Sequence, residues 1–355
     1  MKLLTKNPAF YSLRYRLLYL WRFIATLSFL KIYNYCLNYL EYKRSAVKMK
    51  SLPPQIIIDI TNNCNLKCPL CPTGLGLIDR NKGRMNLELY EEILDQLEAK
   101  TQIIHLYNWG EPLLLRDFPR YCELARDKGF VISTSSNLSM ILDKRQVTDI
   151  INSGLDRLIV SYDGQSERTY SMYRQGGDYK RLVENLKLFI QTKQTLGKIY
   201  PLIVLQFVRH RGNQEEVANL AKACHKLGAD KFQVVDILLP FGGGINPDLI
   251  EKWVTEDRLN NEENSYQFRK SDLGKVCEHL WKFPIINHDS SISPCCFVYL
   301  IKNDMGNIAD GGFRAVWNNE KYQTARLMFV EKSVVDCPPC SRCPVLITYL
   351  NEVKL

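Results

Sequence analysis

The stretch "QIIIDITNNCNLKCPLCPTG", residues 55–74, places three cysteines directly after an apolar run. The run "QIIIDI" has the β-branched composition of a short buried strand. Cys64, Cys68 and Cys71 follow it, with three and then two residues between them. Three thiols so close together indicate a metal site on the loop that follows this strand.

The chain has 355 residues, 46% of them hydrophobic, which suffices for one large domain with appendages. Its twelve cysteines cluster as Cys-x-x-Cys pairs, and no secretory signal precedes them. A disulfide framework would be more evenly spread and is typical of small secreted chains. We therefore expect a cytoplasmic protein whose reduced thiolates bind metal.

Positive charge is concentrated at the N-terminus. Residues 1–50 contain ten Lys or Arg, eleven aromatic residues and a single acid, Glu41, which accounts for the whole net charge of +9. Arg22 and Lys31 interrupt the apolar pattern, so we expect no membrane-spanning helix. Two interpretations fit this basic amphipathic helical segment: peripheral contact with a membrane surface, or a helical layer packed on the domain with a basic outer face. The remaining residues show no basic stripe, so nucleic acid is not an expected partner.

Six strand-like runs alternate with amphipathic helical patterns after Pro54. They cover residues 55–60, 102–107, 130–135, 157–162, 202–208 and 231–237. Such alternation predicts an α/β fold with a parallel sheet, closed or partly closed into a (β/α)6 barrel. We divide the chain into an N-terminal segment (1–50), a barrel core (51–240), a linker (241–275) and a small Cys-rich module (276–355). Ligands in such sheets bind at the carboxyl ends of the strands.

The three cysteines of the opening stretch lie at such a carboxyl end. Three thiolates can hold three irons of a 4Fe-4S cluster and leave the fourth iron without a protein ligand. Zinc is the competing interpretation, although structural zinc usually takes four protein ligands and no His lies near this loop in the sequence.

The spacing Cys-x3-Cys-x2-Cys after the first strand resembles that of the radical SAM superfamily. The resemblance implies that the open iron binds S-adenosylmethionine, and that an electron from the cluster cleaves it to a 5′-deoxyadenosyl radical, which abstracts hydrogen from a substrate. "NWGEP", residues 108–112, is similar to the family's Gly-Gly-Glu-Pro stretch, with Trp109 in place of the first glycine. Other polar residues after the strands match the family pattern. The cofactor-binding candidates are Gly110, Glu111, Ser136, Asn137, Ser161, Asp163 and Arg174.

Each of these positions also has a structural interpretation. An ordinary turn explains the segment around Gly110, and helix caps explain short polar residues after strands. Arg174 could be a surface residue. Gln206 and Asp236 could face the barrel interior, but strand alternation alone does not fix their direction.

The C-terminal module carries a second group of cysteines. It resembles the SPASM or shorter twitch extension of radical SAM enzymes, which binds auxiliary clusters. Ser290 stands where the family has Gly, and "CPPCSRC" stops short of the full SPASM block, which argues against two auxiliary clusters. We expect one auxiliary 4Fe-4S cluster, with a four-thiolate zinc site as the alternative. Its candidate ligands are Cys277, Cys295, Cys337 and Cys340, with Cys343 able to replace one of the last pair and either Cys295 or Cys296 spare.

Three cysteines stand apart from both groups. Cys36, Cys122 and Cys224 lie in helical patterns, where we expect small buried hydrophobic side chains.

These residues predict a radical SAM oxidoreductase or maturase with an auxiliary cluster. The expected substrate is a peptide, a carbohydrate-like metabolite or a lipid-linked molecule, and the expected electron donor is a protein such as ferredoxin or flavodoxin. The pattern identifies no catalytic residue. The alternative is a non-catalytic iron-sulfur electron carrier or a zinc-stabilised binding protein.

Overall fold

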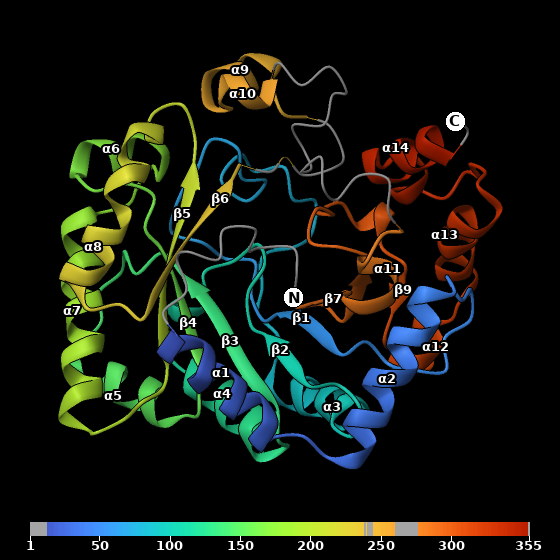
Figure 1. Cartoon of the computed structure of the whole chain (residues 1–355), viewed down its shortest axis with the longest axis horizontal. Coiled ribbons are helices and arrows are strands. Elements are labelled where there is room, and N and C mark those ends of the chain that lie inside the picture. Colours follow the sequence, from blue (N-terminus) through green and yellow to red (C-terminus); the bar gives the residue numbers. More distant parts are fainter. Residues whose placement is uncertain (1–12, 238, 240–243, 260–275, 354–355) are drawn as a thin grey trace.

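A computed structural model describes residues 13–237, 239, 244–259 and 276–353. Its centre is one sheet with the strand order β6-β5-β4-β3-β2-β1-β7-β8-β9 (Figure 1). The strands β1 to β6 are parallel, which confirms the predicted partial barrel, and the sheet is open rather than closed. These strands are β1 (Gln55–Asp59), β2 (Ile103–His105), β3 (Val131–Ser136), β4 (Arg157–Ser161), β5 (Leu202–Arg209) and β6 (Lys231–Asp236).

Helices pack on one face of this parallel sheet. Alternate strand residues such as Leu158 and Val160 join the main core with Tyr90 and Phe189 of the helices. The covering helices are α3 (Leu87–Leu97), α4 (Phe118–Asp127), α5 (Lys144–Asn152), α6 (Glu167–Tyr173), α7 (Tyr179–Thr195) and α8 (Leu220–Leu227). The strands β1, β4 and β5 are mostly apolar, as is usual for buried parallel strands, whereas β3 ends in a run of Ser and Thr.

The C-terminal module extends the same sheet. Its strand β7 (Ile285–Asn287) pairs in parallel with β1, and β8 (Ser291–Ser293) and β9 (Gly306–Asn307) continue in antiparallel order. The helices of the module are α11 (His279–Lys282), α12 (Phe313–Trp317), α13 (Glu320–Glu331) and α14 (Pro344–Val353). The segment 241–275 lies partly outside the described residues, and its described part forms α9 (Pro247–Trp253) and α10 (Glu256–Leu259).

The N-terminal segment forms two helices, α1 (Leu13–Ala25) and α2 (Phe29–Lys43). Tyr15 of α1 packs against Ile159 and Leu202 on the sheet face opposite the main core. Polar contacts fix α1 at the amino ends of the strands, because Arg22 pairs with Asp156 and the Tyr200 hydroxyl donates to a carbonyl of α1. The helices therefore form a layer on the domain, as one of the two interpretations expected, but their outer face carries exposed apolar side chains such as Trp21 and Phe29 rather than being simply basic. None of the helices in the described ranges has the length and apolar character needed to cross a bilayer.

Candidate active site

The three cysteines of the first group occupy a tight loop after β1. Cys71 N–H donates to the carbonyl of Cys68 at 3.1 Å, and Leu66 N–H points to the Cys64 sulfur at 3.5 Å. Gly74 packs so closely under this loop that a Cβ atom there would lie 2.5 Å from the carbonyl oxygen of Cys68. The loop conformation thus depends on a glycine just beyond the third cysteine.

Burial controls the chemistry of these thiols. It raises the pKa of Cys64 to about 12 and that of Cys68 to about 11, and the neighbouring thiols of the loop add to the shift at both residues. Both groups are therefore neutral thiols at physiological pH unless a metal stabilises the thiolate. Among the described residues, no three His, Cys, Asp or Glu side chains are placed to hold one metal ion. A 4Fe-4S cluster does not require three side chains around one metal ion, because each thiolate binds a different iron.

Arg174 connects the cysteine loop to strand β4. Its Nε donates to Asp163, which is fully buried, and its Nη1 lies 3.7 Å from the Cys68 sulfur. Asp163 also accepts from Val208 N–H at 2.7 Å. Arg174 is therefore a partly buried residue that bridges a carboxylate and a cysteine, not a free surface cation.

Glu111 and Asn137 form a second connection. The Glu111 carboxylate accepts from Asn137 N–H at 2.7 Å and from Leu113 N–H at 3.2 Å. The Asn137 side chain in turn donates to Asn65, within the cysteine loop, at 3.0 Å. Burial raises the pKa of Glu111 to about 7, although these hydrogen bonds oppose the shift. A group with such a pKa titrates near physiological pH.

Gly110 and the two serines complete the set of cofactor-binding candidates. A Cβ atom on Gly110 would lie 1.8 Å from the carbonyl oxygen of Thr61, so only glycine fits at this position. Ser136 ends β3 and helps to hold Glu111 through a side-chain hydrogen bond. Ser161 ends the neighbouring strand β4, opposite Gln206 of β5. All the candidates therefore lie near the carboxyl ends of β1 to β4.

The structure also reveals site residues that sequence reasoning missed. Asp59 ends β1, and burial raises the pKa of its carboxyl group to about 7. Its Oδ2 accepts from Trp109 N–H at 3.3 Å, beneath the "NWGEP" segment. The Trp109 indole donates to the carbonyl of Val298 at 3.0 Å and lies edge-on to Tyr299. The residue that replaces the family glycine thus connects the barrel to the Cys-rich module. A polar residue at the end of an otherwise apolar strand was the only sequence signal for Asp59.

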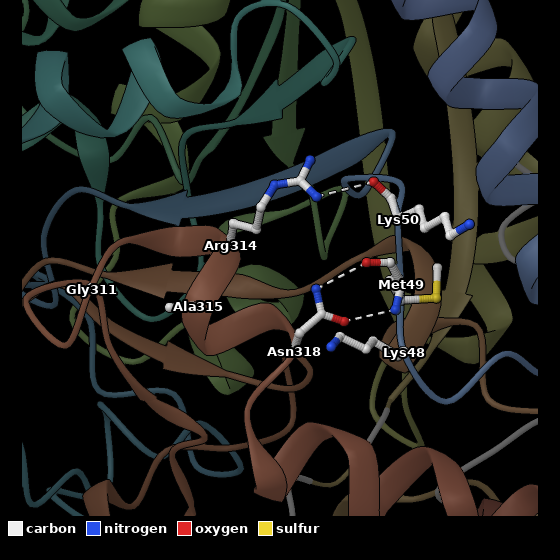
Figure 2. A pocket seen from close by; sticks show the side chains of 7 residues that line it. All are labelled: Lys48, Met49, Lys50, Gly311, Arg314, Ala315 and Asn318. Carbon is white, nitrogen blue, oxygen red and sulfur yellow. Dashed lines mark hydrogen bonds between the residues drawn. The ribbon is translucent and has the colours of Figure 1, made fainter.

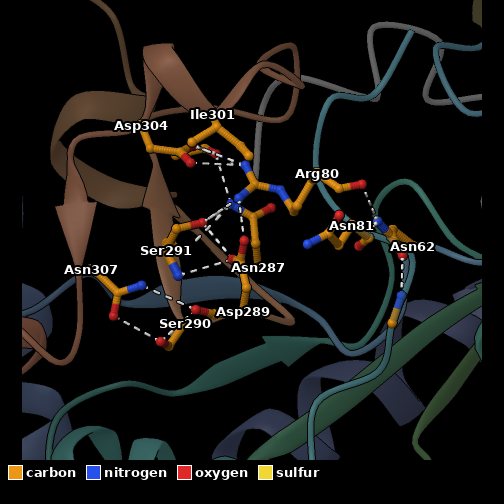
Figure 3. A network of polar contacts seen from close by, with 12 residues as sticks. Asn62, Arg80, Asn81, Asn287, Asp289, Ser290, Ser291, Ile301, Asp304 and Asn307 are labelled. Atoms are coloured by element: carbon orange, nitrogen blue, oxygen red, sulfur yellow. Dashed lines mark hydrogen bonds and ion pairs between the residues drawn. The ribbon is translucent and has the colours of Figure 1, made fainter. Parts of the chain in front are cut away.

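Arg80 makes a second connection between the barrel and the module (Figure 3). Its guanidinium donates to Asp289 at 2.7 Å, to Ser291 at 2.6 Å and to Asp304 at 2.9 Å. Asn62 holds the same loop from the other side through the carbonyl of Asn81, at 2.9 Å. The loop after the cysteines is therefore attached to the β7–β8 hairpin. Ser290 in this hairpin has φ of 64°, the left-handed conformation in which glycine costs least.

The C-terminal thiols form a second group, in which Cys337 is buried and the other cysteines are half-buried. Burial is the main cause of a raised pKa at Cys295 and Cys340, and the nearby thiols of Cys277 and Cys343 raise both further. The thiol of Cys296 also raises the pKa of Cys295, and that of Cys337 raises the pKa of Cys340. Cys337 differs, because its thiol donates to the carbonyl of Lys321 at 3.5 Å. The four thiols of Cys277, Cys295, Cys340 and Cys343 thus lie together.

The isolated cysteines are only partly as expected. Cys122 and Cys224 are buried, as predicted. The prediction for Cys36 is wrong, because its side chain is exposed on α2. A helical pattern shows which residues share a face but not whether that face points inward.

The structure contains an open cavity of about 740 Å³, whose lining residues are shown in Figure 2. It lies between the segment after α2 and helix α12, and Lys48, Lys50 and Arg314 line it. The Asn318 side chain joins its walls through hydrogen bonds to the backbone of Met49, at 2.7 and 3.0 Å. No cysteine lines this cavity, so the candidate active site lies elsewhere.

Comparison with known proteins agrees with this geometry. A family model of the radical SAM superfamily matches residues 58–203, and one of the SPASM iron-sulfur cluster-binding domain matches residues 277–344. The chain belongs to the radical SAM superfamily. It is an enzyme of this class with a SPASM-type C-terminal domain, and its cofactors are 4Fe-4S clusters and S-adenosylmethionine.

Two curated relatives are similar in sequence. The tungsten-containing aldehyde ferredoxin oxidoreductase cofactor-modifying protein of Pyrococcus furiosus is 22% identical over 81% of this chain and 86% of its own length. The PqqA peptide cyclase of Bradyrhizobium diazoefficiens is 24% identical over 56% of this chain and 50% of its own length. This chain therefore matches only half of the cyclase.

Two solved structures share the fold. Streptococcus suis SuiB bound to S-adenosylmethionine has a TM-score of 0.62 at 16% identity, over 89% of this chain and 77% of that chain. The enzyme anSMEcpe, bound to S-adenosylmethionine and a peptide, has a TM-score of 0.57 at 19% identity, over 83% of this chain and 88% of that chain. At these identities the likeness concerns the fold alone.

Proposed function

We propose that this enzyme reductively cleaves S-adenosylmethionine and uses the resulting radical to abstract hydrogen from a substrate. The observation that carries the proposal is the loop of Cys64, Cys68 and Cys71, which Arg174 and Asn137 contact at the carboxyl ends of the strands. When bound there, a reduced 4Fe-4S cluster supplies the electron for cleavage. The donor set fits this cofactor, because three thiols on one loop, of which Cys68 is buried and Cys64 and Cys71 are half-buried, leave one iron open.

The surrounding residues would bind and orient the cofactors. Gly110 and Glu111 would receive the ammonium group of S-adenosylmethionine, with Ser136 and Asn137 fixing the Glu111 carboxylate. Ser161 would contribute a hydroxyl at the end of β4. Asp163 would act through Arg174, because its carboxylate is occupied by Arg174 and Val208 N–H. Arg174 would then position the Cys68 loop.

For the auxiliary cluster we propose the ligands Cys277, Cys295, Cys340 and Cys343. The mutual influence of their thiols supports a common site, which Cys296 and Cys337 also border. Cys337 was a candidate from spacing, and its contact with the carbonyl of Lys321 makes it the less suited of the last three cysteines. Cys296 would be the spare member of the adjacent pair.

The proposed substrate is a peptide. This rests on the sequence similarity to PqqA peptide cyclase, over 56% of this chain. Carbohydrate-like and lipid-linked substrates are the alternatives. A ferredoxin or flavodoxin would supply the electron.

The test is anaerobic reconstitution of the full chain with iron and sulfide, followed by addition of S-adenosylmethionine and a strong reductant. We expect about eight irons per chain, together with 5′-deoxyadenosine. Cys68→Ala should lose 5′-deoxyadenosine formation, and Cys36→Ala, an exposed cysteine outside both groups, should retain it. Bound zinc, or clusters without cleavage by the unaltered enzyme, would favour the carrier or binding-protein alternative.

A further inference from the structure

Helices α1 and α2 turn their apolar residues toward solvent. Of the 21 large hydrophobic side chains exposed in the described part of the chain, 12 belong to these two helices. Trp21 is 68% exposed and Phe29 is 80% exposed. We call this set of twelve the outer apolar face. It consists of Leu13, Leu17, Leu20, Trp21, Ile24, Phe29, Leu30, Ile32, Tyr33, Tyr35, Tyr39 and Leu40.

The inner face of α2 is polar, the reverse of an ordinary surface helix. Its buried residues are Lys31, Asn34, Asn38 and Glu41. The Asn34 side chain donates to the carbonyl of Leu52 at 2.9 Å and accepts from Leu52 N–H at 2.8 Å. The Asn38 side chain donates to the carbonyl of Trp281 at 2.7 Å. A rotation of α2 that buried the apolar residues would break these hydrogen bonds and leave buried carbonyls unsatisfied. The fold therefore fixes the outer apolar face in its exposed position.

The exposed charges carried by these helices and by the segment after them are all positive, although Arg14 pairs with Asp230 of the domain at 3.6 Å. The exposed ionic residues on α1, on α2 and directly after them are Arg14, Arg16, Lys43, Arg44, Lys48 and Lys50. The single acid of residues 1–50, Glu41, is buried and accepts from Lys50 N–H and Ser51 N–H. The cavity of Figure 2 adds Arg314 beside Lys48 and Lys50. An occupant of this surface must therefore be both apolar and negatively charged.

We propose that α1 and α2 dock the enzyme on an anionic lipid bilayer, with the outer apolar face inserted at the level of the headgroups. Aromatic and aliphatic side chains flanked by Lys and Arg are the composition that such interfacial helices use. A second copy of the chain fits less well, because it would bring the same positive charges together. Since α1 contacts the amino ends of the strands, the docked enzyme would keep the cysteine loops, at the carboxyl ends, away from the contact.

This inference goes beyond the proposed function and does not rest on it. The experiment is sedimentation of the full reconstituted chain with vesicles of phosphatidylcholine and phosphatidylglycerol in equal parts. We expect the enzyme to bind these vesicles, and to bind them more weakly when salt is added. Vesicles of phosphatidylcholine alone should also be bound more weakly. The double variant Trp21→Glu/Phe29→Glu should bind at least about 100-fold more weakly, because two aromatic side chains no longer enter the interface. Lys43→Gln/Arg44→Gln should bind about 30-fold more weakly.

A matched control replaces exposed apolar residues elsewhere. Ile141 is 79% exposed and Val334 is 58% exposed, and Ile141→Glu/Val334→Glu should bind vesicles like the unaltered enzyme. Formation of 5′-deoxyadenosine, measured without vesicles, shows that each variant is folded and separates this proposal from that of the active site. Absence of vesicle binding by the unaltered enzyme would overturn the docking proposal. Equal binding by Trp21→Glu/Phe29→Glu, or soluble dimers that only this variant disrupts, would also overturn it.

Discussion

Replacement of Arg174 by Gln tests how the cysteine loop is held. Asp163 is fully buried and Arg174 is 17% exposed, so Arg174→Gln leaves a carboxylate without its charge partner. Two charges about 4 Å apart at an effective dielectric constant of about 20 attract with about 4 kcal/mol. Removal of one partner from a buried pair costs about 3–5 kcal/mol. We therefore expect Arg174→Gln to lower the free energy of unfolding by about 4 kcal/mol.

The measurement is urea unfolding of the reduced, metal-free chain, followed by circular dichroism. The double variant Arg174→Gln/Asp163→Asn removes both charges and should recover about 1–3 kcal/mol relative to the sum of the single changes. The control is Arg84→Gln, whose ion pair with Asp117 is exposed, and it should cost less than about 1 kcal/mol. A cost below about 1 kcal/mol for Arg174→Gln, or strict additivity in the cycle, would refute the bridging role of Arg174.

Four further changes test other parts of the site. Burial raises the pKa of Glu111 from 4.5 to about 7, so ionisation of this carboxyl group should lower the free energy of unfolding as pH rises from 4.5 through 7. Glu111→Gln should remove about 3 kcal/mol of that loss, measured by urea unfolding. An unchanged pH profile of stability in this variant would contradict the prediction. Gly110→Ala places a Cβ atom 1.8 Å from the Thr61 carbonyl oxygen. It should abolish S-adenosylmethionine binding in equilibrium dialysis and leave the iron count unchanged. Retained binding would show that the backbone around residue 110 can shift. Trp109→Phe deprives the Val298 carbonyl of its donor and should cost about 1 kcal/mol in urea unfolding, and no change would mean that the indole contact contributes nothing. Cys340→Ala should lower the iron count by about four, whereas Cys337→Ala should leave it unchanged. A lower iron count in Cys337→Ala but not in Cys340→Ala would show that Cys337 is the ligand.

The parts of the fold that local patterns encode were predictable. All six runs of the barrel form strands, within two residues of the expected ends. The reason is that buried parallel strands read as short apolar runs, and amphipathic helices between them show a 3.6-residue period. The placement of the three cysteines after the first strand followed from the same pattern.

Features that depend on tertiary partners were not predictable. The two short runs of β7 and β8 carry too few residues for a periodic signal, so their place in the sheet could not be inferred. The face of α2 that packs on the domain could not be predicted, because periodicity separates the two faces of a helix but does not show that Asn34 and Asn38 point inward. The choice between Cys337 and Cys343 as cluster ligand likewise depends on the backbone path after α13, which the spacing of the cysteines does not fix.

The pairing of β1 with β7 has a consequence for synthesis of the chain. Ile57 pairs with Ile285, about 230 residues later. At about 5–20 residues per second, translation of that interval takes about 10–50 s. During this time one edge of β1, next to the cysteine loop, has no strand to cover it. A nascent chain with an open strand edge is prone to aggregate. Slow or interrupted translation should therefore reduce the soluble yield of this enzyme more than that of a barrel whose first strand pairs only with nearby segments.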